Sequence, residues 1–471
     1  MAHILAALQG EHPLSEKRKA VQGILDKLEN DLDTQSLSDH ERDCMLEKLK
    51  VYGRDPRGSD PIFSEKGIET LAKHGFQTPS KPYSRQALRC LANAMFLKDD
   101  SRGRLVELGF APKACLQIAE DCVEDEFLGS RILFLTTYAK NDHLVDLIDN
   151  HHLAESVAKN LQRHAERPPP SGSPDPIADM ALTDTLNLFY NVTSFLEKEH
   201  PDKLAGFEHS ISHIVSLLNS RPIPSPKPLD QPMDKLVNAL MNLDLSKQIE
   251  TFFPSSSPTT LPTRFTTLVD KALSAYSESE LETSLTPLVT VLLKLLPSAP
   301  EEALLHFQSK FLPQSSERTH VLGQGDSVPE KLLKNTTNPM APNLRELLGH
   351  LLFGLSDKDA TKFVDNVGYG FASGYLFQNQ IPVPDSVREA HGDTATGRPV
   401  NPITGQFTDQ EREPNVPEMT DDEKEREAER LFVLFERLRQ TGVVDVENPV
   451  RQAYQTGRIQ ELDSDDEEDK D

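Results

Sequence analysis

Apolar residues recur at spacings of three and four along most of the chain before about residue 360, a pattern typical of helices that bury one face. In "ALRCLANAMF", Leu88, Leu91 and Met95 share one face, and "SRILFLTTYA" carries a broader apolar stripe. The segments "DTLNLFYNVTSFL", "KLVNALMNL", "LTPLVTVLLKLL" and "LRELLGHLLFGL" follow the same style. No segment shows the convincing period-two alternation of a strand. The pattern predicts an all-α protein of short, closely spaced helices.

These apolar helices recur along the chain as repeats. They start near residues 87, 130, 183, 235, 287 and 344, so that successive gaps are 43, 53, 52, 52 and 57 residues. The first gap falls within the roughly 40–47 residues of armadillo and HEAT repeats. Pro/Ser-rich stretches at 167–176, 221–232 and 253–262 account for the longer gaps as inserted surface loops. Because one such helix cannot bury its apolar face alone, we expect an armadillo/HEAT-like α-solenoid over residues 1–365, with a concave inner face.

The chain changes character after the last repeat. We expect, in order, a glycine-containing turn and extended linker over 366–419, an amphipathic helix over 420–442 and an acidic disordered tail over 443–471. Thr420 and Glu423 form a capping box for the late helix. Leu431 and Phe435 lie on its apolar face.

The charge balance is strongly acidic and limits the classes of partner. Among 471 residues, 75 are acidic and 50 are basic, which gives a formal net charge of −25. A nucleic-acid backbone would be repelled, so we expect no nucleic-acid partner. The charge suits solubility and equally suits a partner with a basic or amphipathic segment. With no secretory signal and no run of about 20 apolar residues, we expect a cytoplasmic protein without membrane insertion, whose four cysteines stay reduced.

A search for chemistry finds no catalytic constellation. "NVGYGFASGYLF" places Gly368, Gly370 and Gly374 in a spacing related to the dinucleotide fingerprint, but "DKDATKFVDN" before it is helical in pattern rather than a strand. A tight helix-to-helix turn is therefore favoured over a cofactor site. His209 and His213 lie four apart without the glutamate of a zincin. We expect neither an enzyme nor a cofactor nor a bound metal.

Polar residues on the repeated helices point to recognition of a peptide. Asn93, Asn191, Asn238 and Asn242 stand within apolar helices, where asparagine is mildly unfavourable. A carboxamide both donates and accepts hydrogen bonds, so it can hold the backbone of a bound peptide. The alternative is that these residues cap helices or pack between repeats.

A basic pair occurs early in the chain. In "KLKVYGRD", Lys50 and Arg54 lie four apart on one expected helical face. The pair suits a carboxylate, although a lone basic pair is also typical of a solvated surface.

Several motifs together resemble the synembryn family, the cytosolic chaperones and guanine-nucleotide exchange factors of heterotrimeric G-protein α subunits (Gα). The strongest matches are "VGYGFASGYL", "VNPITG" and "EMTDDEKEREAERLFVLFERLRQTGVV", in the family's order and spacing. Weaker matches are "LRCLANAMF", "ILFLTTYA", "LFYNVT" and "LVNALMNL". The resemblance covers most of the chain, densely after residue 344, and the Pro/Ser-rich inserts suggest a fungal member.

The resemblance implies a specific function. The concave face of an armadillo/HEAT solenoid takes hold of the C-terminal helix of Gα, the nucleotide pocket of Gα becomes disordered, and GDP leaves. The same grip stabilises nucleotide-free Gα and chaperones newly made Gα. The protein itself then needs no nucleotide or other cofactor. We expect a monomer in the cytoplasm that is recruited to the plasma membrane through Gα.

The resemblance also implies the residues that contact Gα. Lys50 and Arg54 match an early basic pair suited to the carboxylate end of the Gα helix, and the late helix around Leu431 matches one that touches the Gα switch region. The complete set is Lys50, Arg54, Asn93, Phe134, Asn191, Asn238, Asn242, Arg345, Leu431 and Phe435.

One departure from the family concerns phosphorylation. Animal members carry an acidic, phosphorylated run before "NPITG", and here that interval is hardly acidic. Ser464, in "SDDEE", fits an acid-directed kinase instead, with an unmodified solubilising tail as the alternative. The competing function is a generic armadillo peptide-binding adaptor or transport receptor. Such a receptor uses a tryptophan–asparagine ladder, and this chain has no tryptophan.

Overall fold

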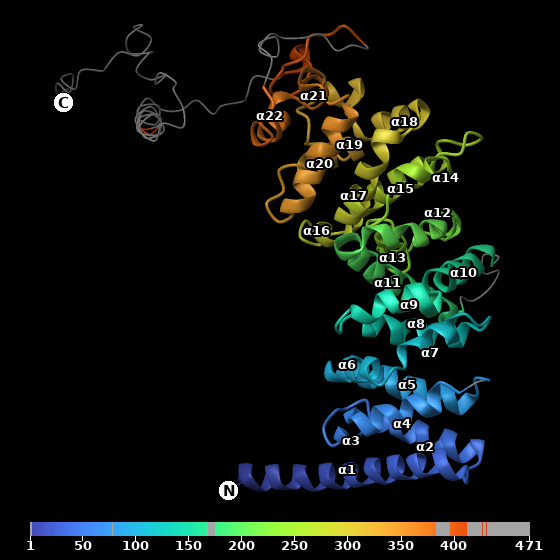
Figure 1. Cartoon of the computed structure of the whole chain (residues 1–471). Coiled ribbons are helices and arrows are strands. Elements are labelled where there is room, and N and C mark those ends of the chain that lie inside the picture. The colour runs from blue at the N-terminus through green and yellow to red at the C-terminus, as the bar shows by residue number, and fades with distance from the viewer. Residues whose placement is uncertain are drawn as a thin grey trace, which may run out of the picture. The chain divides into compact units, whose positions relative to one another are not determined.

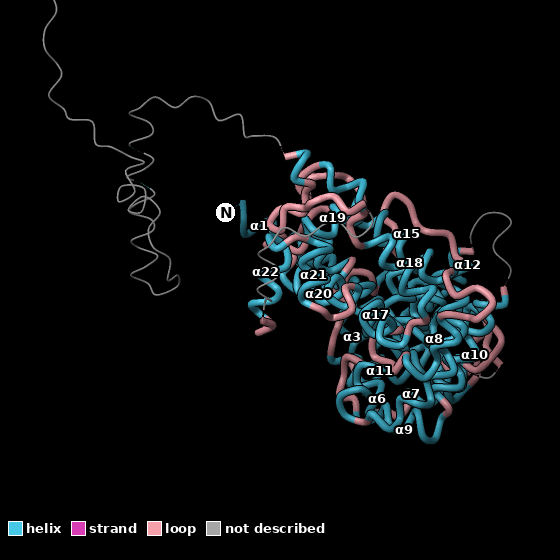
Figure 2. Tube along the Cα trace, turned by 90° about the horizontal axis from the view of Figure 1, so that it is seen from above, coloured by secondary structure: helices cyan, strands magenta, loops and turns pink. Residues whose placement is uncertain are grey.

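The fold comes from a computed structural model. The described residues are 2–77, 79–167, 175–382 and 396–411, together with residues 426 and 430, with side chains from residue 14 onward. The chain divides into two units, Met1–Gln410 and Glu411–Asp471. The described part of the first unit consists of helices and loops, with an isolated antiparallel bridge between Val400 and Phe407 (Figure 2). The all-α prediction is confirmed.

Seven helices form a row that we call the ladder, because each contacts the next member along the chain (Figure 1). All six helix positions expected from the periodicity fall within ladder helices. The ladder consists of α2 (Asp39–Tyr52), α5 (Pro82–Leu97), α8 (Val123–Thr136), α11 (Pro176–Glu199), α13 (Met233–Ala239), α17 (Thr286–Leu295) and α20 (Pro342–Leu355).

A second row of helices packs against the ladder and supplies the other half of the core. Within it α7 contacts α10, α10 contacts α12, and α12 contacts α15, so this row also follows the order of the chain. Its members are α1 (Ala2–Thr34), α4 (Glu65–Gly75), α7 (Ala111–Ile118), α10 (Leu153–Glu166), α12 (Ile211–Ser220), α15 (Thr260–Ala275), α18 (Glu301–Phe311) and α19 (Val328–Asn335). Two stacked rows that share one continuous core are the arrangement predicted for an α-solenoid.

Other helices connect the two rows or close the last repeat. These are α3 (Asp60–Phe63), α6 (Asp100–Glu107), α9 (Asp142–His151), α14 (Ile249–Phe252), α16 (Glu280–Ser284), α21 (Ala360–Val367) and α22 (Tyr369–Gln378), with 3₁₀ turns at Pro201–Ser210, Ser246–Gln248, Leu296–Ser298, Ser315–Thr319 and Thr408–Gln410.

Local sequence sets where the ladder helices begin. Ser38 and Glu41 form a capping box before α2, in which the Ser38 backbone amide donates to the Glu41 carboxylate at 2.8 Å. Prolines begin α5, α11 and α20, at a position where the missing N–H is not needed. The insert predicted over 253–262 ends early for the same reason, since α15 begins at Thr260 and Pro262 lies in its first turn.

Buried polar groups cross-link the rows near the middle of the unit. Glu126 on α8 is 1% exposed, and its carboxylate accepts a hydrogen bond from Thr185 of α11 at 2.9 Å. His164 of α10 places Nε2 2.9 Å from the same carboxylate oxygen. A buried carboxylate is tolerated only when it is well partnered, so this cluster fixes how three helices sit together.

A second buried carboxylate links α8 and α11. Asp184 accepts from Arg131 Nε at 2.9 Å, and the Asp184 side chain is only 5% exposed. Burial raises the pKa of Asp184 to about 6, although the Arg131 guanidinium opposes this shift.

The glycine motif forms a tight turn between α21 and α22. Gly368 has φ +80°, and a Cβ there would lie 3.1 Å from the Ile403 carbonyl oxygen. The amide of Tyr369 donates to Pro402 O at 2.7 Å, and the amide of Gly370 donates to Ile403 O at 3.0 Å. A phosphate bound at this helix N-terminus would have to accept hydrogen bonds from these same two amides. The predicted helix-to-helix turn is confirmed, and the loop 401–405 occupies the place of a ligand.

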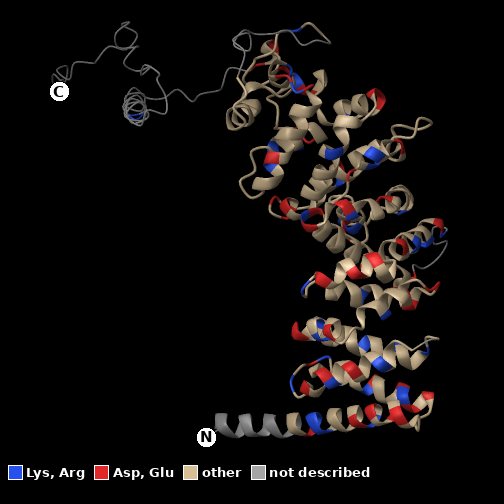
Figure 3. Ribbon diagram, viewed as in Figure 1, with Lys and Arg blue, Asp and Glu red and all other residues tan. Residues whose placement is uncertain are grey.

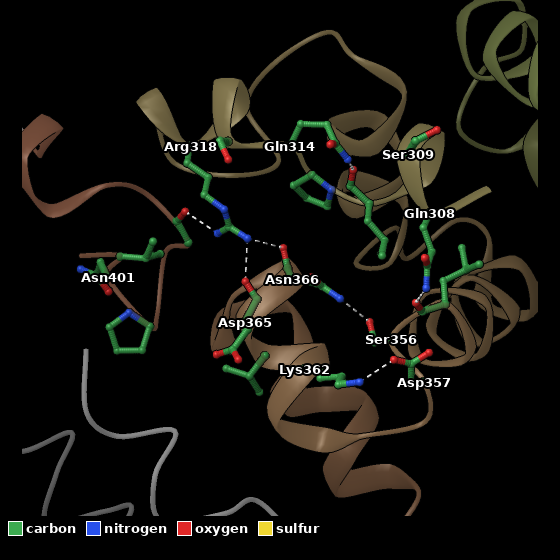
Figure 4. Close-up of a pocket in the computed structure, with 18 of the residues that line it drawn as sticks. Gln308, Ser309, Gln314, Arg318, Ser356, Asp357, Lys362, Asp365, Asn366 and Asn401 are labelled. Carbon is green, nitrogen blue, oxygen red and sulfur yellow. Dashed lines mark hydrogen bonds and ion pairs between the residues drawn. The ribbon is translucent and has the colours of Figure 1, made fainter. Parts of the chain in front are cut away.

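Arg318 joins this loop to the rest of the unit (Figure 4). It is 5% exposed, and its guanidinium donates to Gly405 O at 2.9 Å, Asp365 O at 2.6 Å and Asn366 O at 3.1 Å. Gly405 has φ +69°, and a Cβ on it would meet Leu322 Cδ1 at 2.4 Å. The two glycine-containing motifs of the sequence therefore pack against each other.

The expected boundary after the solenoid needs a correction. The turn and extended linker predicted over 366–419 are wrong for Tyr369–Gln378, which form α22. Ala372 and Leu376 lie one turn apart and are buried, which holds this segment in a helix.

We expect Gly368→Ala to lower the free energy of unfolding by about 1–3 kcal/mol, because a Cβ is strained at positive φ and meets the Ile403 carbonyl. Gly374→Ala in α22 is the matched control. No heavy atom lies within 4 Å of its added Cβ, so this variant should be neutral or more stable by up to about 1 kcal/mol. Urea unfolding followed by circular dichroism compares the two, and equal losses would contradict the assigned turn.

We also expect Asp184 to make stability depend on pH. A carboxyl whose pKa is raised on folding stabilises the protein most below its unfolded pKa, and this stabilisation is lost as the pH rises through about 6. The stability of the wild type relative to Asp184→Asn should fall by about 1–2 kcal/mol between pH 5 and pH 7.5. Urea unfolding of both proteins at the two pH values measures this difference. A pH-independent difference would exclude the raised pKa.

Candidate partner-binding face

A basic pocket opens beside α2, α5 and α8 at the N-terminal part of the ladder, with a volume of about 460 Å³. Its walls contain four Lys or Arg side chains and no acidic one, although Lys and Arg are mixed with Asp and Glu along the helices in general (Figure 3). The lining residues are Lys50, Arg54, Arg89, Ala92, Asn93, Phe96, Leu97, Phe127, Leu128 and Arg131. In a protein with a formal net charge of −25, this pocket is a locally basic surface whose charge favours an anion.

The early basic pair lies in this pocket, but not as one helical face. Lys50 is in the last turn of α2, and its Nζ donates to Gln86 Oε1 of α5 at 3.0 Å. The helix ends at Tyr52, so Arg54 stands in the following turn and is exposed. The expectation of a shared helical face is therefore wrong, because Gly53 ends α2 before Arg54. The two cations still line the same cavity.

Helix α5 supplies the floor of the basic pocket. Arg89 lies one turn before Asn93 on α5, and its guanidinium contacts the Glu124 carboxylate at 3.2 Å. Asn93 is half-buried and lines the pocket. Phe96 is 72% exposed, which is unusual for so large an apolar side chain. Sequence reasoning missed Arg89 and Phe96, although their spacing of one turn from Asn93 on the same helix was a signal for both.

Arg131 reaches the pocket from α8 and was also missed. Its guanidinium carbon lies 4.6 Å from the centre of the Phe127 ring, and its Nε is bound by Asp184. No local signal in the sequence could join Arg131 to Lys50, because the stacking of α5 and α8 creates that proximity.

The chemistry of the basic pocket suits binding rather than catalysis. Guanidinium and ammonium groups bind a carboxylate by charge-assisted hydrogen bonds. The Asn93 carboxamide offers a donor and an acceptor for a peptide backbone. Phe96 adds an exposed apolar surface. Together they suit a peptide segment that carries both a carboxylate and apolar side chains.

Two other asparagines of the predicted set cross-link ladder helices. Asn191 Nδ2 donates to Thr137 Oγ1 at 2.8 Å, which ties α11 to the end of α8. Asn242 is 8% exposed, and its Nδ2 lies 3.2 Å from both Tyr190 O and Thr193 Oγ1. These three hydrogen bonds correspond to the alternative in which asparagines pack between repeats. Asn238 instead lines a separate cavity of about 590 Å³.

Phe134 and Arg345 lie apart from the basic pocket. Phe134 is half-buried on α8 and meets the ring of Tyr138 edge-to-face, with centroids 5.3 Å apart. Arg345 is exposed on α20, where it lines a cavity of about 410 Å³ together with Gly370 and Tyr375 of α22. The structure therefore unites Lys50, Arg54 and Asn93 and separates them from Arg345.

The remaining predicted residues, Leu431, Phe435 and Ser464, lie outside the described residues. Within the predicted late helix only Arg426 and Arg430 are described, and both are helical and exposed.

Other chemistry is limited in the part of the chain that the structure describes. No group of three or more His, Cys, Asp or Glu side chains there is arranged to hold a metal ion. No described helix is long and apolar enough to cross a membrane. The four cysteines, Cys44, Cys90, Cys115 and Cys122, are free thiols.

Among solved structures, two engineered proteins are similar to part of this chain. A designed armadillo repeat protein covers 60% of this chain and 99% of its own, with a TM-score of 0.39 and 12% identity. Another engineered protein covers 58% of this chain and 98% of its own, with a TM-score of 0.40 and 14% identity.

Several curated proteins are similar in sequence. A synembryn-like chaperone of Schizosaccharomyces pombe is 29% identical over 191 residues, or 38% of this chain and 36% of that protein. The chaperone Ric-8 of Drosophila pseudoobscura pseudoobscura is 28% identical over 38% of this chain and 34% of its own length. These two matches thus span about a third of each relative. The chaperone Ric-8A of Macaca fascicularis is 22% identical over 447 residues, which cover 87% of this chain and 83% of that protein.

A family model covers most of the chain. The model described as Ric8, guanine nucleotide exchange factor synembryn, matches residues 45–458. This range contains the basic pocket and the paired glycine motifs. The motifs "VGYGFASGYL" and "VNPITG", which suggested the resemblance, contact each other in the fold. The chain belongs to the synembryn family of guanine nucleotide exchange factors.

Proposed function

We propose that this protein is a guanine-nucleotide exchange factor and folding chaperone for Gα subunits. It captures the C-terminal helix of Gα on the side of the ladder helices that neither the neighbouring ladder helices nor the second row covers. The family match supports the activity, since the matching model is described as an exchange factor and the relatives are named chaperones.

The basic pocket is the observation that carries the proposed mode of binding. A C-terminal segment ends in a free carboxylate, and the pocket presents Lys50, Arg54 and Arg131 without an acidic neighbour in its lining. Phe96 and Tyr138, which are 72% and 57% exposed, offer apolar contacts for the side chains of an amphipathic helix. We expect Asn93, which lines the same pocket, to form hydrogen bonds with the backbone of this segment.

Exchange follows from linkage between two binding events on Gα. If the protein binds nucleotide-free Gα more tightly than Gα·GDP, then its binding must lower the affinity of Gα for GDP by the same ratio. Holding the C-terminal helix away from the body of Gα supplies this difference, because the nucleotide pocket loses its support. The protein needs no nucleotide site of its own.

A chaperone role uses the same contacts. An incompletely folded Gα exposes the apolar face of its C-terminal helix. A ladder that covers this face stabilises the folded helix relative to the unfolded chain. The late helix around Leu431 and Phe435 would add a second contact on the same Gα. Two linked contacts strengthen binding without a tighter individual site. An acid-directed kinase acting on Ser464 remains part of the proposal.

The second candidate is a generic armadillo adaptor or transport receptor for peptides. The basic pocket suits any carboxylate-bearing peptide, so the pocket alone does not decide between the two. The exchange assay does, because an adaptor has no reason to change the affinity of Gα for GDP.

We expect the full-length protein to accelerate GDP release from purified Gα·GDP and to weaken the affinity of Gα for GDP by about 5- to 150-fold, the range typical of coupling between two binding sites. Release of a fluorescent GDP analogue measures the rate, and gel filtration then detects a complex with nucleotide-free Gα. Unchanged release together with no stable complex would exclude the proposed function.

The variant Lys50→Glu/Arg54→Glu provides the mechanistic control for this assay. Like charges at the pocket should weaken the complex by about tenfold or more. Lys66→Glu/Lys73→Glu on α4 makes the same change of charge at exposed positions away from the pocket, and it should leave exchange unchanged. Equal effects of the two variants would remove Lys50 and Arg54 from the site.

We expect two ladder asparagines to separate binding from stability. Asn242→Ala should lower the free energy of unfolding by about 1–3 kcal/mol, because it removes a buried carboxamide and the hydrogen bonds that it donates to Tyr190 O and Thr193 Oγ1. Asn93→Ala should change stability by less than about 0.5 kcal/mol but weaken Gα binding severalfold. Urea unfolding and titration with Gα measure the two effects. The reverse pattern would contradict the assignment of Asn93 to the partner-binding face.

A further inference from the structure

Arg131 is held in the basic pocket by two neighbours. Phe127, one turn before it on α8, places its ring 4.6 Å from the guanidinium carbon. Asp184 of α11 accepts from Nε at 2.9 Å. A guanidinium bound at Nε and supported on an aromatic ring keeps one orientation, although the side chain is 41% exposed.

The other two nitrogens of this guanidinium remain available. In the described part of the chain, no hydrogen bond or ion pair joins Arg131 Nη1 or Nη2 to another residue, whereas Arg85 on α5 uses Nε, Nη1 and Nη2 on Glu124, Asp125 and Cys122. Two parallel N–H donors match the two oxygens of a carboxylate. Arg131 therefore presents an oriented fork in the cavity that also contains Lys50 and Arg54.

Holding Arg131 with Asp184 costs the free energy of burying a carboxylate. Its carboxyl is almost fully buried, and burial raises its pKa to about 6 against the influence of Arg131 and a hydrogen bond from Asn187. A neutral side chain at this place in α11 would avoid the desolvation of a charge. The position of the Arg131 fork is what this carboxylate secures.

We propose that Asp184 is a positioning residue that holds Arg131 to read the terminal carboxylate of the segment bound in the basic pocket. This inference rests on the proposed function, which supplies a Gα C-terminal segment as the ligand. It adds α8 and α11 to the carboxylate site and identifies a residue that never touches the ligand but sets the geometry of one that does.

A double-mutant cycle tests this role with two fluorescent peptides of the Gα C-terminus, one with a free carboxylate and one amidated. In the wild type, the free acid should bind about tenfold more tightly than the amide. Arg131→Gln should weaken the free acid about tenfold and reduce its advantage over the amide. Asp184→Asn should weaken the free acid about threefold to fivefold when Arg131 is present, and not at all in the Arg131→Gln background, since interacting residues are not additive.

Matched variants separate positioning from a general loss of structure. Asp179→Asn on the same helix removes the partner of Arg221, an ion pair of 2.6 Å outside the basic pocket, and should leave both peptides unaffected. Arg131→Lys keeps the charge without the fork and should bind the free acid with intermediate affinity. Circular dichroism and thermal midpoints identify any variant that fails to fold, and the two Arg131 variants then test the carboxylate contact alone.

The outcomes distinguish this inference from the proposed function. GDP release by the wild type decides whether the protein acts on Gα. If release is accelerated but Asp184→Asn weakens peptide binding equally in both backgrounds, Asp184 is only structural and the inference is overturned. It is also overturned if Arg131→Gln leaves the preference for the free acid unchanged, or if the wild type binds neither peptide.

Discussion

The structure depends on one constraint. Each ladder helix is one rung, and every rung between the first and the last must bury two flanks, one against the preceding rung and one against the next. A third side faces the second row of helices, so a single strip of each helix stays accessible. The apolar content of the ladder follows from this geometry. The accessible strips of successive helices follow one another, which is why a partner-binding face can be assembled from short segments of distant sequence.

The same constraint sorts the polar residues of the ladder. Those that fall between rungs must be paired, as Asn242 is with the Tyr190 carbonyl and Glu126 is with Thr185. Those that fall on the strip need no internal partner and remain available to a ligand. Arg131 combines both situations: its Nε donates to Asp184 between α8 and α11, while its side chain also lines the basic pocket.

The last repeat has no following rung, and the two glycine motifs pack together at this end of the ladder. The loop 401–405 closes the start of α22, and Arg318 binds that loop to the end of α21. Glycine suits positions 368 and 405 because both have positive φ; a Cβ at 368 would also crowd the Ile403 carbonyl at 3.1 Å, and one at 405 would meet the Leu322 side chain. The glycine spacing at 368–374, which resembles a phosphate-binding loop, thus allows close packing of the start of α22 against the loop 401–405.

Periodicity, capping and proline placement are local properties, so they suffice to predict the helices, their repetition and the basic character of the segment around Lys50. The family motifs are also visible in the sequence. The stacking of the helices settles which asparagines are cross-links and brings Arg131 and Lys50 to one cavity, and packing also makes α22 helical and leaves Arg54 outside α2. Those features depend on how rungs stack across inserts of different length, and a cavity shared by two residues 81 positions apart leaves no periodic trace in either segment.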